Sequence, residues 1–181
     1  MNDTQSKNTQ AKKIQGVSKI ACRFIDHLSA ELGVTIIHQH YNEDTCEYEG
    51  TEHKWFDSWN WRRVDGFFVT KDSSNNRRPV AVEFLGDYWH GHPNSRQMVE
   101  WKEKMFKKTQ GRLRQLRNHE DNYIILYIWE SEYQVFCTQF KQDNSIKLAS
   151  FCRFFDHNLE YTDLNIPGQH TNNANTTQHN E

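Results

Sequence analysis

The sequence lacks several features that would place it in a broad class of proteins. It has no apolar run near the ~20 residues that a membrane-spanning helix needs, and its first residues, MNDTQSKNTQAKK, contain no apolar export signal. None of its four cysteines forms a CxxC pair, so a cysteine-based zinc site is not expected. The formal net charge is −2, so the chain also lacks an overall positive charge. We expect a soluble intracellular protein with reduced, structural cysteines, on which any surface for nucleic acid is local.

Enough apolar sequence is present for one folded domain. The 181 residues are 35% hydrophobic and 25% charged, and this length fits a domain of about 100–200 residues. Both ends are polar and lack hydrophobic periodicity. We therefore expect residues 1–14 and 163–181 to be disordered and residues 15–162 to form the domain.

Hydrophobic periodicity predicts the elements of this domain. Apolar residues at three- and four-residue spacings predict a helix from Val17 to Leu32, which Gly33 would end. The other patterns predict strands at 34–40, 63–70, 79–86 and 123–129, a long helix at 96–118, a weaker strand or loop at 134–140 and a short helix at 145–158. Residues 41–61 give no clear pattern. Helices beside a mixed sheet make an α/β or α+β domain.

Two carboxylates occupy strands that are predicted to be neighbours. If 63–70 and 79–86 form a hairpin, Asp65 lies opposite Phe84, or opposite Glu83 after a shift of one residue. In the second register the acids share a face with Cβ atoms ~5 Å apart, and one stays protonated unless a cation lies between them. Mg²⁺ suits such a pair, because it binds one or two carboxylates together with water and phosphate oxygens. The alternative is that Asp65 belongs to a turn and Glu83 to a solvated face. A charge without a partner is, however, unfavourable within the apolar segment VAVEFL, which contains Glu83.

Positive charge is concentrated in the long predicted helix. Its segment 101–117, WKEKMFKKTQGRLRQLR, carries seven basic residues and one acidic residue. Such a stripe suits phosphate contacts, which strengthen binding by counterion release, although lysine-rich helices are also common as solvated faces. Tyr88, Trp89 and Trp101 are expected at the surface, where rings stack on bases or wedge between base steps. Packing in the core is the alternative for these rings.

The segment VEFLGDYWHGHP, residues 82–93, collects ionisable groups at the end of a strand. Two acids precede His90 and His92, and two aromatic residues lie between the acids and the histidines. The pattern is typical of an active-site edge, and the alternative is a satisfied loop. A zinc site built on the two histidines and a carboxylate is a further, weaker alternative.

These segments together resemble one nuclease family. VDGFFV, then VEFLGDYWHGHP with 18 residues from Asp65 to Glu83, then a basic helix and IILYIWESE are similar to the very-short-patch-repair-like endonucleases. That branch belongs to the restriction-endonuclease-like superfamily with the PD-(D/E)xK core, and similar motifs occur in homing endonucleases and in open reading frames of large DNA viruses. The resemblance covers about residues 17–133. It implies a mixed central sheet flanked by helices, double-stranded DNA as partner, and Mg²⁺-dependent cleavage or nicking in which Mn²⁺ can substitute.

The resemblance also implies roles for particular residues. Asp65 and Glu83 match the acidic metal ligands, and His90 matches a catalytic histidine. Trp101 is similar to a tryptophan that, together with Tyr88 and Trp89, helps to wedge DNA open. Thr109 and Arg112 match polar positions of the family that face phosphates. Together with three lysines of the basic helix, Lys104, Lys107 and Lys108, they are expected to contact the DNA backbone.

The chain departs from the family at three places. Leu85 replaces the lysine of the superfamily motif, whose role we expect His90 to take. Ala21 replaces a glutamate of the first helix, where Asp26 and Glu31 are the remaining acids. This leaves open a catalytically inactive DNA-binding module that keeps the nuclease fold. The zinc-binding positions of the mismatch-repair members hold Asp87, Asn94 and Ser131. Neither a structural zinc ion nor mismatch specificity is therefore expected.

Overall fold

The elements of the domain are defined by a computed structural model that describes residues 18–56, 61–71, 74–93 and 100–155. In chain order they are α1 (Lys19–Leu32), β1 (Ile37–Asn42), β2 (Glu47–Gly50), β3 (His53–Phe56), β4 (Trp61–Val64), β5 (Gly66–Lys71), β6 (Arg77–Leu85), α2 (Asp87–His90), α3 (Glu100–Arg117), β7 (Ile124–Trp129), α4 (Glu130–Phe140), a 3-10 helix (Leu148–Phe151) and β8 (Arg153–Phe154). The disorder expected at 1–14 and 163–181 lies outside the described residues.

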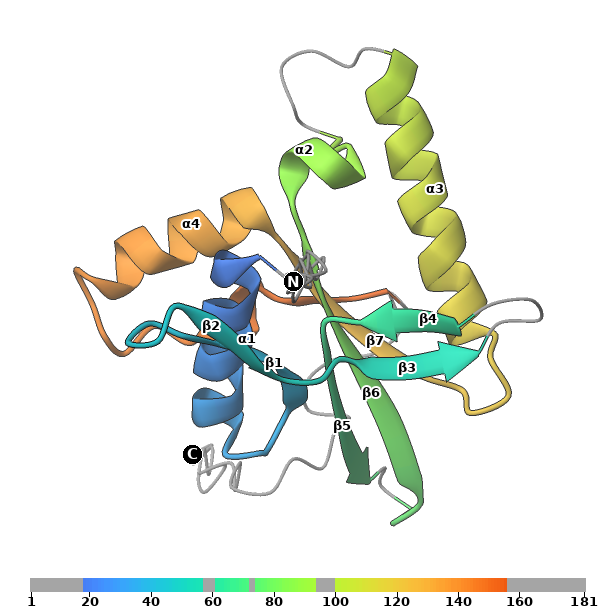
Figure 1. The fold of residues 1–181 in the computed structure, drawn as a ribbon, viewed down its shortest axis with the longest axis horizontal. Coiled ribbons are helices and arrows are strands. Elements are labelled where there is room, and N and C mark those ends of the chain that lie inside the picture. Colours follow the sequence, from blue (N-terminus) through green and yellow to red (C-terminus); the bar gives the residue numbers. More distant parts are fainter. Residues whose placement is uncertain (1–17, 57–60, 72–73, 94–99, 156–181) are drawn as a thin grey trace, which may run out of the picture.

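A mixed sheet forms the centre of the domain (Figure 1). Its six strands have the order β2-β1-β5-β6-β7-β8, and β3 and β4 pair in a separate two-stranded sheet. Within the large sheet, β6 and β7 are parallel and the other pairs are antiparallel. The crossover between the parallel strands contains α2 and α3. A mixed sheet with these helices confirms the expected α+β fold class.

Helices cover both faces of this sheet. Alternate residues of β6, Val80 and Val82, pack with the buried stripe of α1, which includes Phe24. Ala81 faces the other way and packs with Leu113 of α3. All six residues of β7 are buried, as expected for a strand with apolar cover on both faces. The sheet therefore has one face covered by α1 and one covered by α3, and successive residues of β6 lie alternately on these two faces.

Most predicted elements are confirmed, two are wrong and one is divided. The strand predicted at 63–70 is broken at Asp65, so that 63–64 belong to β4 and 66–70 to β5. Helix α1 begins after the N-cap Ser18 and ends at Gly33, which has φ 64° in the left-handed region. Residues 134–140 belong to helix α4 and not to a strand or loop, because Tyr133 and Phe136 pack one turn apart in the core. The helix predicted at 145–158 is a short 3-10 helix followed by β8 in its described part. The unassigned region 41–61 supplies β2 and β3.

None of the helices in the described ranges combines the length and the apolar character needed to cross a bilayer. The longest of these helices, α3, is rich in basic residues. It lies on the sheet through a narrow apolar stripe that includes Leu113 and Leu116.

Candidate active site

Asp65, the residue between β4 and β5, lies at the same level as Glu83 of β6. The pairing of β5 with β6 includes Gly66 opposite Val82, and continuing that register by one residue brings Asp65 opposite Glu83. This is the shifted one of the two registers that the sequence allows. Oδ2 of Asp65 accepts a hydrogen bond from the backbone N–H of Phe84 at 2.8 Å. The hairpin thus brings the two acids together, and this hydrogen bond fixes the orientation of the first.

An arginine of α3 neutralises Glu83. The glutamate is 2% exposed, and Arg112 donates from Nη1 to Oε1 at 2.8 Å and from Nη2 to Oε2 at 2.5 Å. Such a two-pronged pair is among the stronger hydrogen-bonded interactions in proteins. The charge of Glu83 raises the pKa of Arg112 further above its ordinary value. The guanidinium expected to face a DNA phosphate is therefore bound to a carboxylate instead.

The position of Arg112 follows from the spacing of buried residues on α3. Thr109, Leu113 and Leu116 are its buried residues, and Arg112 falls within the same stripe at three- and four-residue intervals. The hydroxyl of Thr109, which is 5% exposed, faces His90 and not solvent. The sequence contained this signal, because the helical spacing alone assigns both polar residues to the side that carries the leucines.

The single charge of Arg112 does not compensate both carboxyl groups. Burial raises the pKa of Asp65 from 3.8 to about 8, and the negative charge of Glu83 is the second cause. The N–H of Phe84 and the charge of Arg112 lower this pKa, but they do not offset the burial. Asp65 is consequently protonated at neutral pH unless a further cation approaches.

His90 is held against α3 by the single helical turn of α2. Gly91 ends this turn with φ 68°, and a Cβ atom there would lie 2.1 Å from the carbonyl oxygen of Lys102. Glycine therefore allows α2 to rest directly on the backbone of α3. Nδ1 of His90 lies 3.0 Å from Oγ1 of Thr109. Burial, followed by the charge of Arg112, lowers the pKa of His90 to about 4, so the ring is neutral at pH 7.

A cleft of about 380 Å³ opens beside these residues and is lined from β4, α2 and α3. His90 and Trp89 contribute to its wall, together with three cationic side chains, Arg62, Lys108 and Arg112. Arg62 lies near the unassigned part of the sequence and was missed as a site residue. A concave surface with several cations suits an anionic ligand such as a phosphate.

The three rings expected at the surface are exposed, and one of them, Trp89, lines the cleft. Tyr88, Trp89 and Trp101 are 58%, 74% and 39% exposed. The ring of Tyr88 lies 5.0 Å from that of Trp89 and 4.9 Å from that of Trp101, between centroids. The rings therefore form one surface cluster, although Trp101 lies on a different helix from the other two.

The lysines of α3 lie on its outer surface. Lys104, Lys107 and Lys108 are exposed. Lys107 forms an ion pair with Glu103 at 2.6 Å, one turn earlier on the helix, while Lys108 lines the cleft. These positions are compatible with binding to the backbone of a long anionic partner, and the ion pair of Lys107 would compete with such binding.

The remaining acids of α1 do not join the carboxylate pair. Ala21 is 2% exposed and lies in the core. Glu31 accepts hydrogen bonds from the backbone N–H groups of Leu148 and Ala149, at 2.6 and 2.9 Å, and so caps the 3-10 helix. Asp26 contacts two histidines of β1.

The alternative zinc site at His90 and His92 is not supported. His92 is 9% exposed and packs edge-on against Trp129, with ring centroids 4.6 Å apart. Among the described residues, one group of at least three His, Cys, Asp or Glu side chains is close enough to hold a metal ion. It consists of Asp26, His38 and His40. Neither His90 nor His92 belongs to it.

Comparison with protein-family models, curated proteins and solved structures finds no match for this chain. The endonuclease resemblance therefore depends on sequence motifs alone. A fold class by itself does not specify a function, so the function has to be argued from the residues of the cleft.

Proposed function

We propose that the protein is a Mg²⁺-dependent DNA endonuclease or nickase, which hydrolyses phosphodiester bonds of double-stranded DNA. The observation that carries this proposal is that Asp65, next to β5, lies beside Glu83 of β6 and close to a cationic cleft. An acid pair beside a site for anions suits metal-dependent phosphodiester hydrolysis. His90, at the wall of the same cleft, adds a group that can transfer a proton.

Asp65 and Glu83 are the residues that would hold the metal ion. Arg112 supplies one positive charge for two carboxyl groups, and burial, followed by the charge of Glu83, raises the pKa of Asp65 to about 8. Oxygen ligands of this kind fit Mg²⁺, which takes few carboxylates and completes its shell with water and phosphate oxygens. Bound there, the ion would lower the pKa of a water ligand and neutralise charge that develops on the phosphate.

His90 acts in this proposal as the general base. Because its pKa is about 4, the ring is neutral at pH 7 and can accept a proton from the attacking water. In the tautomer with the proton on Nδ1, Thr109 Oγ1 accepts that N–H, and Nε2 is left to take the proton. Thr109 is thus a positioning residue for the histidine.

The other cleft residues bind the DNA. Arg62 and Lys108 provide charge for the phosphates next to the carboxylates. Tyr88, Trp89 and Trp101 form an exposed cluster large enough to stack on bases or to separate a base step. Lys104 and Lys107, on the outer surface of α3, extend this binding surface along the DNA backbone.

One observation favours a second candidate, a DNA-binding module without catalytic activity. Arg112 occupies both carboxylate oxygens of Glu83 and provides in part the charge that a metal ion would bring. If no ion displaces or accompanies this guanidinium, the cleft binds DNA and does not cleave it.

Relaxation of supercoiled plasmid separates the two candidates. We expect the purified protein to convert supercoiled plasmid to nicked or linear DNA with Mg²⁺ and to leave it intact with a chelator. An Asp65→Asn variant purified in parallel controls for contaminating nucleases. Binding without cleavage in Mg²⁺ and in Mn²⁺ would contradict the nuclease proposal and support the inactive module.

A further inference from the structure

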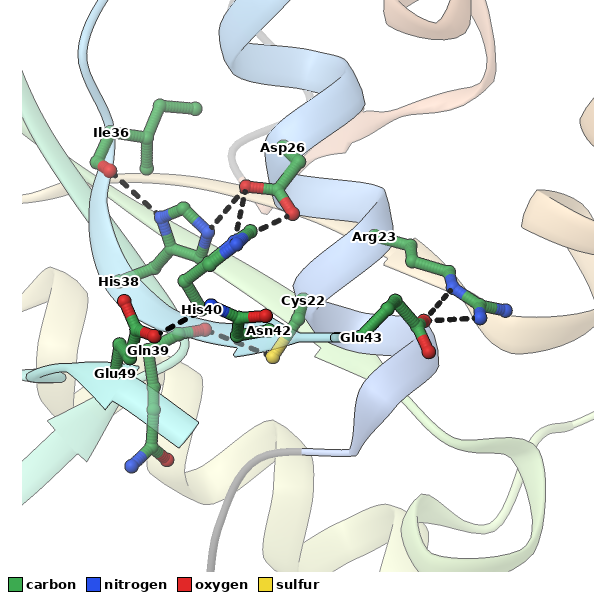
Figure 2. Close-up of polar contacts among 10 residues, drawn as sticks. All are labelled: Cys22, Arg23, Asp26, Ile36, His38, Gln39, His40, Asn42, Glu43 and Glu49. Atoms are coloured by element: carbon green, nitrogen blue, oxygen red, sulfur yellow. Dashed lines mark hydrogen bonds and ion pairs between the residues drawn. The ribbon is translucent and has the colours of Figure 1, made fainter. Parts of the chain in front are cut away.

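A second group of potential metal ligands lies on the α1 face of the sheet, away from the cleft. Asp26 comes from α1, and His38 and His40 come from β1, on either side of Gln39. Residues two apart on a strand point to the same face, so both imidazoles meet the helix that packs there. Figure 2 shows the three side chains pointing toward one another. Their ligand atoms all lie within 4.8 Å of one another.

The distances in this group are close to those of a coordination shell. Nε2 of His38 lies 3.0 Å from Oδ1 of Asp26, and Nδ1 of His40 lies 3.1 Å from Oδ2. A tetrahedral zinc ion with bonds of about 2.0–2.1 Å separates its ligand atoms by roughly 3.3 Å. Small side-chain movements are therefore enough to admit an ion between the three residues.

A backbone hydrogen bond prepares His38 as a ligand. Its Nδ1 lies 2.9 Å from the carbonyl oxygen of Ile36 (Figure 2). A carbonyl oxygen only accepts hydrogen bonds, so Nδ1 carries the proton and Nε2 of the neutral ring presents a lone pair to Asp26. Metal-bound histidines are commonly oriented in this way by a backbone carbonyl on the other ring nitrogen. Two acceptors that face each other at 3.0 Å repel unless a cation, either a proton or a metal ion, lies between them.

The group is also open to solvent. The side chain of His38 is 11% exposed, whereas those of Asp26 and His40 are 41% and 49% exposed. An ion can therefore enter without opening the fold, and water can complete its shell. Two imidazoles and one carboxylate favour a divalent d-block ion such as Zn²⁺ over Mg²⁺ or Ca²⁺, which prefer oxygen ligands.

We infer that Asp26, His38 and His40 form a binding site for a Zn²⁺-class ion that links α1 to β1. The register of β1 with β5 pairs Ile37 with Phe67 and His38 with Gly66, so β1 is joined to the sheet over a short length there. An ion held by both histidines and by the helix secures this strand. The site is independent of the proposed nuclease site, because Glu83 is bonded to α3 on the other face of the sheet.

Titration with Zn²⁺ and Co²⁺ tests this site. We expect the protein to bind one equivalent of Zn²⁺ more than its His40→Ala variant, and Co²⁺ to give a visible absorption band that the variant lacks. Loss of a direct ligand should weaken binding at least about 100-fold, since even the loss of an outer partner costs about 10–100-fold. Zn²⁺ should also raise the thermal unfolding temperature of the parent more than that of the variant.

Matched variants exclude trivial explanations. The chain has ten histidines, so weak background binding is removed by taking the difference between parent and variant. Asp121, which pairs with His119 at 3.2 Å, provides a control carboxylate, and Asp121→Asn should bind Zn²⁺ like the parent. Asp26→Asn keeps the shape of the side chain, removes its charge and should bind like His40→Ala. Equal stoichiometry and affinity in the parent, Asp26→Asn and His40→Ala would overturn the inference and leave a proton as the only cation between these side chains.

Discussion

Glu83 and Asp26 are carboxylates on opposite faces of the same sheet, and their partners differ. Glu83 has a side chain that is 3% exposed and is bound by a guanidinium, whereas the side chain of Asp26 is 41% exposed and is bound by two imidazoles. Arginine keeps its charge at every physiological pH, so its partner can be buried without losing compensation. Histidine is neutral for much of that range, and a carboxylate that depends on it remains near water.

The difference has a consequence for metal binding. At Asp26 the partners are imidazoles, which can themselves bind a metal ion, so an ion would add to the group without displacing either of them. At Glu83 the partner is a cation, and an ion must share the carboxylate with Arg112 or displace it. In the proposed nuclease site, Asp65, whose pKa is raised to about 8, is therefore the carboxyl group left to attract a further cation.

The largest expected effect concerns the histidine of the cleft. His90→Ala should lower the single-turnover rate of DNA cleavage by about 10²–10⁴-fold, because it removes the proposed general base. Thr109→Val should lower the rate only roughly fivefold, since one neutral hydrogen bond is worth about 1 kcal/mol. DNA affinity, measured by mobility shift, should change little in both variants. A His90→Ala protein as fast as the parent would contradict the assignment.

A large loss of stability is expected when the buried ion pair is broken. Arg112→Ala leaves Glu83 buried and unpaired, and the free energy of unfolding should fall by about 3–5 kcal/mol. Arg114→Ala, at an exposed position of the same helix, should change it by less than about 0.5 kcal/mol. Urea denaturation measures both. Mg²⁺ should stabilise Arg112→Ala more than the parent, because the ion replaces the charge of the guanidinium, and an equal response would argue against metal binding at Glu83.

The pH dependence of stability should reveal Asp65. Because its pKa is about 8 in the folded protein and 3.8 ordinarily, the folded state retains a proton that the unfolded chain loses. The stability contributed by this group is complete below about pH 4 and is lost as the pH rises to about 8, at no more than about 1.4 kcal/mol per pH unit. In a chelator, Asp65→Asn should therefore gain stability relative to the parent between about pH 5 and pH 8. Parallel curves would show that the carboxyl is not buried as described.

The smallest effect is expected at the exposed lysines. Replacing Lys104, Lys107 and Lys108 by alanine should reduce the salt dependence of DNA binding, by up to about 0.9 in slope for each phosphate that the variant no longer binds. Lys147, exposed beside the 3-10 helix on the α1 side, provides a control whose replacement should leave the slope unchanged. An unchanged slope in the triple variant would make the surface of α3 an ordinary solvated face.

The sequence predicts the local parts of the cleft better than the pairing of distant elements. The hairpin placed Asp65 beside Glu83 to within one residue, because a short turn limits the possible registers. The pairing of Glu83 with Arg112 spans 29 positions and depends on how α3 lies on the sheet. Because Arg112 is one of seven basic residues in this segment, it was assigned to the solvated basic surface and not to the buried stripe of α3.

The site on the α1 face shows the same limit. The alternation of His38 and His40 in one strand was visible in the sequence and places both rings on one face. Their contact with Asp26 depends on the packing of α1 against β1, which hydrophobic periodicity specifies only coarsely.

Helix α4 was not predicted because its apolar residues do not all lie on one face. Val135 is 49% exposed and obscures the spacing of the buried aromatic residues Tyr133 and Phe136.

Cleavage by an Asp65→Asn variant tests the central claim most directly, because this substitution removes a ligand charge and keeps the side-chain shape. Supercoiled plasmid is incubated with an excess of protein and saturating Mg²⁺, and parent and variant are first matched for DNA affinity and for circular dichroism. We expect the parent to nick or cut the plasmid and the variant to leave it supercoiled. Cleavage at the same rate by a folded Asp65→Asn protein would contradict metal-dependent hydrolysis at Asp65.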